Sequence, residues 1–181
     1  MIFAPSLEGS APIRTPGPKF LNAFRERVRA GLLSGQPHPR SNYVVSHAGA
    51  RRLQVRAADW WTAIAVGLND LDLQVIESGR VRYQVRYWRW AAYALALSGI
   101  IAATMAVVFL AMDLPGYIER HPNTLLPGFS VEQHVFFAWA MVAFWGFIWP
   151  WLLIAMHKRP VRRMLERLIA EVDSLRTPGT M

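Results

Sequence analysis

Two histidines are the residues of this chain whose type and position could bind a cofactor. His134 and His157 lie at opposite ends of an uncharged block, Val135 to Met156. A neutral imidazole is a good axial ligand for haem or chlorophyll. Neither histidine lies in the middle of the block, and the other uncharged block has no histidine to complete a pair. We therefore expect solvated histidines and predict no cofactor, with haem or chlorophyll ligation by His134 or His157 as the alternative.

The other polar residues do not indicate enzymatic chemistry. The chain has no cysteine, which excludes thiolate metal sites, disulfides and cysteine nucleophiles. It has no glycine-rich phosphate loop, HExxH or GxSxG pattern. Asp70 and Asp72 alternate along a predicted strand, and solvent exposure explains them. The sequence thus predicts no catalytic residue, no metal site and no enzyme.

Two long apolar segments must instead dominate the fold. The chain is 53% hydrophobic, and the blocks Trp90 to Met112 and Val135 to Met156 contain no charged residue. As helices, both are long enough to cross the ~30 Å core of a bilayer. We predict transmembrane helices over residues 89–112 and 131–157, joined by an external connection over 113–130. A capping box formed by Ser130 and Gln133 should begin the second helix.

The basic residues predict the orientation of this hairpin. The net charge is +8, yet Arg120 is the only basic residue between the two blocks. Because basic residues are retained on the cytoplasmic side, both termini should be cytoplasmic at an inner membrane. The cations expected at the membrane surface, facing anionic lipid or simply solvated, are Arg82, Arg86, Arg89, Lys158, Arg159, Arg162 and Arg163. The tryptophans expected to anchor the hairpin in the interface are Trp88, Trp90, Trp149 and Trp151.

A row of small residues on the first apolar block predicts a close helix contact. The row consists of Ala94, Ser98, Ala102 and Ala106, which share one helix face. It either seats the second helix through Ala140, Ala143 and Gly146 or receives a helix of another subunit. Neither block has an ionisable group, which argues against ion or proton translocation.

The segments expected in the cytoplasm divide into three parts, of which two are predicted to contain amphipathic helices. Residues 1–41 are predicted to form a flexible Pro-rich tail and, from Lys19, a basic amphipathic helix that adheres to a membrane or packs on the protein itself. Its apolar face comprises Phe20, Phe24, Val28 and Leu32. Residues 158–181 should form an amphipathic helix and tail, with an apolar face of Val161, Leu165, Leu168, Val172 and Leu175. We expect this face to dock within the protein, with pairing to a second copy or to a partner as the alternatives.

Residues 42–88 are predicted to form a small α+β unit of ββαββ type. Asp59 should cap its helix. A closing hairpin pairs the apolar alternation around Leu73 with that around Tyr83, which leaves Arg82 and Arg86 on the opposite face.

The predicted fold class is therefore a membrane α-helical protein: a two-span transmembrane hairpin, a small cytoplasmic α+β unit and amphipathic terminal helices. By elimination, we expect a non-catalytic accessory, scaffolding or assembly subunit of a larger inner-membrane complex. Its partners would be other membrane-protein subunits and anionic lipid, not nucleic acid, because the membrane orientation already accounts for the positive charge. The alternatives are a haem- or chlorophyll-contacting subunit of a respiratory or photosynthetic complex, and a membrane-surface protein that forms a homo-oligomer.

Overall fold

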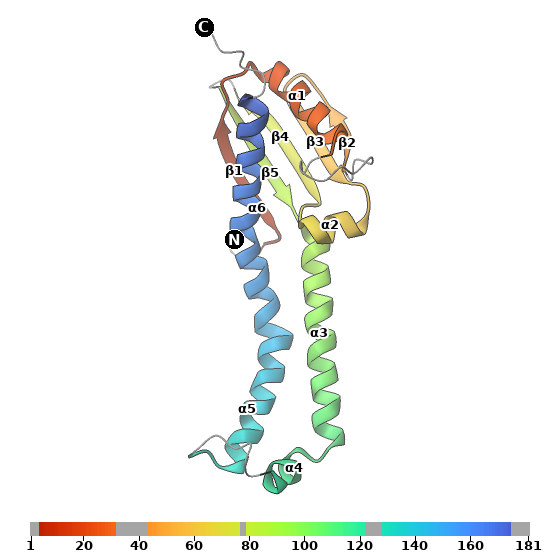
Figure 1. The fold of residues 1–181 in the computed structure, drawn as a ribbon, viewed down its shortest axis with the longest axis vertical. Helices are drawn as coiled ribbons and strands as arrows, with labels where there is room; N and C mark the ends of the chain where they lie inside the picture. The colour runs from red at the N-terminus through yellow and green to blue at the C-terminus, as the bar shows by residue number, and fades with distance from the viewer. Residues whose placement is uncertain (1–3, 32–42, 77–78, 122–127, 175–181) are drawn as a thin grey trace. The chain divides into compact units, whose positions relative to one another are not determined.

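The computed structural model describes residues 4–31, 43–76, 79–121 and 128–174 (Figure 1). The chain divides into two compact units. Residues 1–91 and 155–181 form the first, which we call the sheet unit, and residues 92–154 form the second, the hairpin unit.

The sheet unit contains a five-stranded antiparallel sheet. Its strands are β1 (Ser6–Pro12), β2 (Tyr43–Ala48), β3 (Arg52–Ala57), β4 (Asp70–Ile76) and β5 (Arg80–Arg86). Their order is β1-β5-β4-β3-β2. The predicted hairpin of β4 and β5 is present, and its register places Leu73 opposite Tyr83.

Side-chain alternation gives the sheet one buried and one exposed face. Along β5, Tyr83 and Val85 are buried, whereas Arg82 and Arg86 are exposed, as expected for successive residues of a strand. The helices α1 (Gly17–Arg29) and the C-terminal part of α6 (Trp149–Ser174) lie over the apolar face (Figure 1). An ion pair of 3.0 Å between Arg27 Nη2 and Glu171 Oε1 joins these helices.

The apolar face of α1 packs within the sheet unit. Phe20, Phe24 and Val28 have no exposed surface. Of the two roles expected for this helix, the structure therefore shows packing on the protein and contradicts membrane adhesion through the same face. Leu32, the fourth residue of the predicted stripe, lies outside the described residues.

The N-terminal prediction was wrong: residues 6–12 form β1 instead of a flexible tail. Leu7 and Ala11 are buried, and β1 pairs with β5 along its whole length. Gly9 is needed because a Cβ there would lie only 2.3 Å from the Tyr83 hydroxyl oxygen. The prolines around this segment suggested a tail, yet proline is tolerated at the ends of an edge strand.

The predicted boundary between residues 157 and 158 is also absent. α6 continues through Pro160 to Ser174 without a break. Val161, Leu165, Leu168 and Val172 are buried in the sheet unit, as the predicted docking requires. Leu175 lies outside the described residues. Proline at residue 160 suggested an interruption, but packing of the following turns holds the helix together.

A short helix, α2 (Trp60–Val66), connects β3 to β4. Its cap is the predicted one, since Asp59 Oδ1 accepts a hydrogen bond of 2.7 Å from Thr62 N. It ends at Gly67, whose φ of 70° lies in the left-handed region that glycine adopts readily.

The hairpin unit is helical. It contains most of α3 (Trp88–Ala111), then α4 (Leu114–Arg120), α5 (Val131–Ala143), the π-helical turn η2 (Phe144–Ile148) and the beginning of α6. The predicted capping box at Ser130 and Gln133 begins α5. The connection between the predicted spans thus contains a helix, α4, that the sequence analysis did not foresee. Two helices, Trp88–Ala111 and Val131–Ser174, are long and apolar enough to cross a membrane.

Candidate interaction surfaces

The uncovered face of the sheet carries the main concentration of polar side chains in the sheet unit. We call it the open sheet face; it comprises Arg52, Gln54, Arg56, Asp70, Asp72, Arg82, Gln84 and Arg86. Strand pairing aligns these residues in rows. One row runs from Arg86 through Asp70 to Arg56, and the next from Gln84 through Asp72 to Gln54. A continuous polar surface therefore crosses the three central strands.

Ion pairs organise one side of this face. Arg52 Nε lies 3.0 Å from Asp72 Oδ1, and Gln54 Nε2 donates to Asp72 Oδ2 at 3.2 Å. Hydrogen bonding from Arg52 lowers the pKa of Asp72 below its ordinary value. Arg56 Nε lies 3.5 Å from Asp70 Oδ1. These four charged residues contribute to a groove of about 350 Å³. Asp70 and Asp72 therefore have arginine partners, which the prediction of simple solvent exposure did not include.

Arg82 and Arg86 are the arginines that β5 contributes to the face, and Arg86 lies opposite Asp70 and helps to lower the pKa of Asp72. Both are exposed on β5. Within the described parts of the chain, no carboxylate forms an ion pair with either guanidinium. Each guanidinium can bind a carboxylate or phosphate through two parallel hydrogen bonds. The β5 side of the open sheet face therefore presents two exposed cations.

His157 lies within the sheet unit and is held by three neighbours. Its Nε2 donates a hydrogen bond of 2.9 Å to the carbonyl oxygen of Gly67. The imidazole stacks on Trp90 with ring centroids 4.0 Å apart, and the Tyr87 ring meets its edge. This differs from the solvated histidine expected from the sequence. Cofactor ligation through Nε2 would require the bond to Gly67 to break.

His134 is the other histidine considered as a ligand, and it lies in the first turn of α5. Its Nδ1 is 2.8 Å from the carbonyl oxygen of Ser130, and the Phe129 ring meets its edge. His134 and His157 belong to different units. Among the described residues, no group of three or more histidine, aspartate and glutamate side chains could hold a metal ion.

The small-residue row contacts the second helix through only part of the predicted residues. Ala94, Ser98 and Ala102 are buried, and Ala106 is half-buried. On the second helix, Gly146 is the predicted residue that approaches the row, since a Cβ added there would lie 2.8 Å from Ala102 Cβ. Ala140 and Ala143 are exposed, so their predicted contact with the row is wrong. The face of the second helix was misassigned because its aromatic and small residues alternate without one clear small-residue stripe.

A disulfide should report the contact between α3 and the second helix. We expect the double variant A102C/G146C to crosslink on mild oxidation, because the two Cβ positions are within bonding range once the backbones separate slightly. The native chain has no cysteine to compete. The readout is mobility on a non-reducing gel. The matched pair A102C/A140C places one thiol on an exposed residue and should stay uncrosslinked; equal crosslinking of both pairs would contradict the assigned helix face.

The cations predicted for the membrane surface fall on two elements of the sheet unit besides β5. Arg89 is in the first turn of α3, and the others lie on α6: Lys158, Arg159, Arg162 and Arg163. Lys158 and Arg89 are half-buried, and the remaining three are exposed.

The four predicted tryptophan anchors have different surroundings. Trp88 and Trp151 are exposed. Trp90 is half-buried and packs on His157 in the sheet unit. Trp149 is half-buried and meets Trp145 edge-on, with centroids 4.9 Å apart, in the hairpin unit. Trp88 and Trp151 are therefore the two of the four whose rings are exposed.

Two contacts that were not predicted from the sequence join distant segments. Tyr83 Oη donates a hydrogen bond of 2.9 Å to Glu166 Oε1, and burial with this bond raises the pKa of Tyr83 to about 12. Asp173 accepts hydrogen bonds of 2.9 Å from the backbone N–H groups of Arg14 and Thr15. Burial alone would raise the pKa of Asp173, but these bonds outweigh it and lower the pKa. No local sequence pattern predicts either pairing, since each joins segments that are far apart in the sequence.

The Asp173 contact should make stability sensitive to acid. A carboxylate whose pKa is depressed by folding stabilises the fold above its unfolded pKa of about 3.9 and loses that contribution as the pH falls through the folded value. We expect D173N to lower stability near neutral pH by about 1–3 kcal/mol. Thermal unfolding across the acid range should show the gap between wild type and variant closing below about pH 4. A gap that stays constant in acid would contradict the assigned role of the charge.

Comparison with known proteins gives no relative of this chain. No family model matches it. No curated protein and no solved structure matches it either.

Proposed function

We propose that this chain is a non-catalytic accessory or scaffolding subunit of a larger inner-membrane complex, and that it docks a partner subunit on the open sheet face. The observation that carries the proposal is the asymmetry of the sheet. One face is covered by α1 and α6, whereas the other presents aligned arginines, carboxylates and amides without a covering element among the described residues.

Membrane insertion is supported by the helices of the hairpin unit. Large apolar side chains remain exposed along them, including Leu110 at 73% and Phe147 at 74%. Exposed apolar surface on this scale is unfavourable in water and suits lipid. The sheet unit contains chain from before and after the hairpin, so an even number of crossings is required. The basic flanks favour the cytoplasmic side for this unit and for both termini.

Docking is supported by the chemistry of the open sheet face. A paired arginine such as Arg52 has its charge compensated by Asp72. Arg82 and Arg86 form no ion pair among the described residues, although Arg86 lies opposite Asp70 and interacts electrostatically with Asp72. Both are held on a strand that is paired on either side, which limits the entropy lost on binding. A partner subunit that presents carboxylates at this spacing would be favoured over a neutral one. Anionic lipid is the competing ligand for the same two cations.

Charge reversal on the open sheet face tests the proposal. Native mass spectrometry of the tagged chain, extracted from its host membranes in mild detergent, should show a stoichiometric foreign subunit. R82E/R86E should lose that subunit, because like charges then face each other. The control K19E/R167E makes the same change in charge at exposed residues of the helix-covered side and should retain it.

The other outcomes separate the alternatives. Retention of the partner by R82E/R86E would move the docking site away from the open sheet face. A homo-oligomer without foreign subunits would favour the self-associating membrane protein. A bare monomer from wild type would contradict the accessory role, and additional mass from a haem or chlorophyll would favour the cofactor-contacting subunit.

A further inference from the structure

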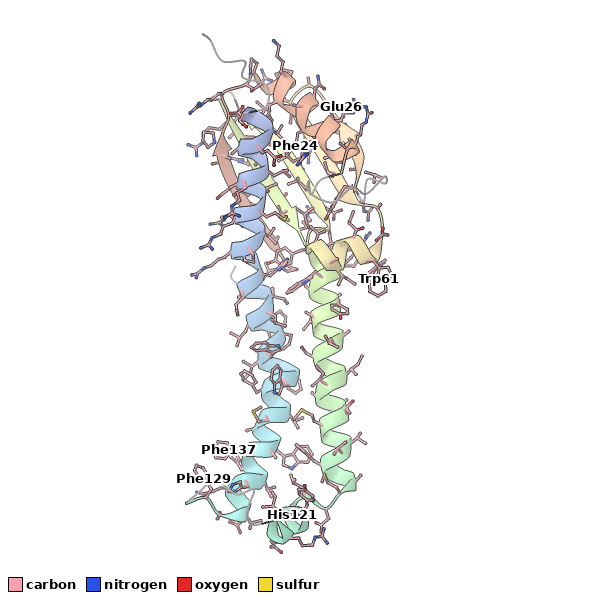
Figure 2. The ribbon with its side chains drawn as sticks, in the orientation of Figure 1. Phe24, Glu26, Trp61, His121, Phe129 and Phe137 are labelled. Atoms are coloured by element: carbon pink, nitrogen blue, oxygen red, sulfur yellow. The ribbon has the colours of Figure 1, made fainter. Side chains whose placement is uncertain are left out.

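Three exposed tryptophans and the half-buried Arg89 form a patch at the end of the sheet unit where α3 begins. We call Trp60, Trp61, Trp88 and Arg89 the tryptophan patch. Their exposed fractions are 51% for Trp60, 80% for Trp61 and 43% for Trp88. Figure 2 shows the Trp61 side chain extending outward from α2.

The patch has a defined internal geometry. The guanidinium of Arg89 lies 5.4 Å from the ring centroids of both Trp60 and Trp88. The two rings meet edge to face with centroids 5.6 Å apart. Arg89 is thus held by cation–π contacts to residues from two elements. This arrangement fixes the position of α2 against the first turn of α3.

The outer side of α2 is unusual for a surface in water. Thr62 and Ala63 are buried against the unit, whereas Trp61 and Ala65 are exposed and Ile64 is half-exposed. The whole helix contains no charged residue. A surface helix normally turns its apolar residues inward and its polar residues outward. Here the outward side is apolar, so contact with lipid is more favourable for it than contact with water.

We propose that the tryptophan patch binds the phospholipid headgroup layer and that α2 acts as an interfacial anchor of the sheet unit. The proposal rests on the membrane insertion proposed above. Continuity argues for this occupant, because Trp88 and Arg89 are the first residues of the same helix whose apolar part is a candidate span. Indole rings favour the headgroup region, and an arginine held among them can bind a lipid phosphate.

Fluorophore quenching in lipid nanodiscs tests the anchor. The cysteine-free chain allows single labels at W61C on α2, V44C on the open side of β2 and I100C in the middle of α3. Val44 is an exposed apolar residue of the same unit, at 49%, and serves as the matched control. Quenchers are aqueous iodide and phospholipids that carry a nitroxide either near the headgroup or deep in the acyl chain.

We expect the W61C label to be quenched most strongly by the shallow nitroxide, with iodide quenching about threefold weaker than at V44C. I100C should respond to the deep nitroxide and V44C to iodide alone. A65C, one turn further along α2, should repeat the W61C result, so that a local effect of losing Trp61 cannot imitate it. If W61C and A65C behave like V44C while I100C responds to the deep nitroxide, the anchor is refuted and membrane insertion stands. If I100C responds to iodide alone, both proposals fail.

Discussion

Replacing Phe24 with alanine is expected to destabilise the sheet unit by about 3–5 kcal/mol, because the change removes a buried ring and leaves a cavity. Phe24 has no exposed surface and packs near Phe20, with ring centroids 6.0 Å apart. It lies on α1 against the apolar face of the sheet, where no solvent can fill the space. This loss is comparable to the whole stability of many small domains.

Hydrogen exchange of the β5 amides measures this effect in the complete chain, because exchange from a central strand requires the unit to open. The variant N22A serves as a control on the same helix, at an exposed residue, and should change the opening free energy by no more than about 0.5 kcal/mol. Similar exchange in F24A and wild type would mean that α1 does not stabilise the sheet. Strong destabilisation by N22A would instead indicate a general sensitivity of α1.

The features that the sequence predicted correctly depend on short-range patterns. The alternation around Tyr83 determines which side of β5 is buried, and it places Arg82 and Arg86 on the other face. The caps at Asp59 and Ser130 need only residues within one turn of the helix. The bounds of α3 and the start of α5 follow from uninterrupted runs of uncharged residues and the cap beside them. These patterns suffice because each contact lies within a few residues along the chain.

The features that were missed depend on tertiary partners. β1 is stabilised by pairing with a strand far along the chain, and nothing local distinguishes it from an extended tail. The continuation of α6 through Pro160 likewise depends on burial of Val161 and Leu165. Which side of the second helix meets Ala102 is decided by packing that involves Gly146. Local propensity cannot supply such information.

The candidate surfaces were predictable where they depend on local patterns and not where they depend on tertiary contacts. The exposure of Arg82 and Arg86 on the open sheet face follows from alternation along one strand. Their alignment with Asp70 and Asp72 requires the strand register. Trp88 and Arg89 were predicted at the membrane surface, but their contact with Trp60 was not, because α2 and α3 are brought together only by the fold.

Replacing Gly67 with alanine is expected to destabilise the sheet unit by about 2–5 kcal/mol, from two separate causes. The φ of 70° places Gly67 in the left-handed region, where a Cβ costs about 1–2 kcal/mol. That Cβ would also collide with the His157 ring, which lies directly over the glycine. Overpacking of this kind costs about 1–3 kcal/mol more. The hydrogen bond from His157 Nε2 to the Gly67 carbonyl holds the two elements at this close approach.

A double-mutant cycle separates the two causes, because H157A removes the collision but leaves the backbone strain. G67A should therefore cost about 1–2 kcal/mol in the H157A background, which is clearly less than in wild type. Hydrogen exchange across α2 and β4 provides the free energies for all four proteins. An equal cost in both backgrounds would show that the collision is relieved by a small movement of the ring. In that case backbone strain alone accounts for the effect of G67A.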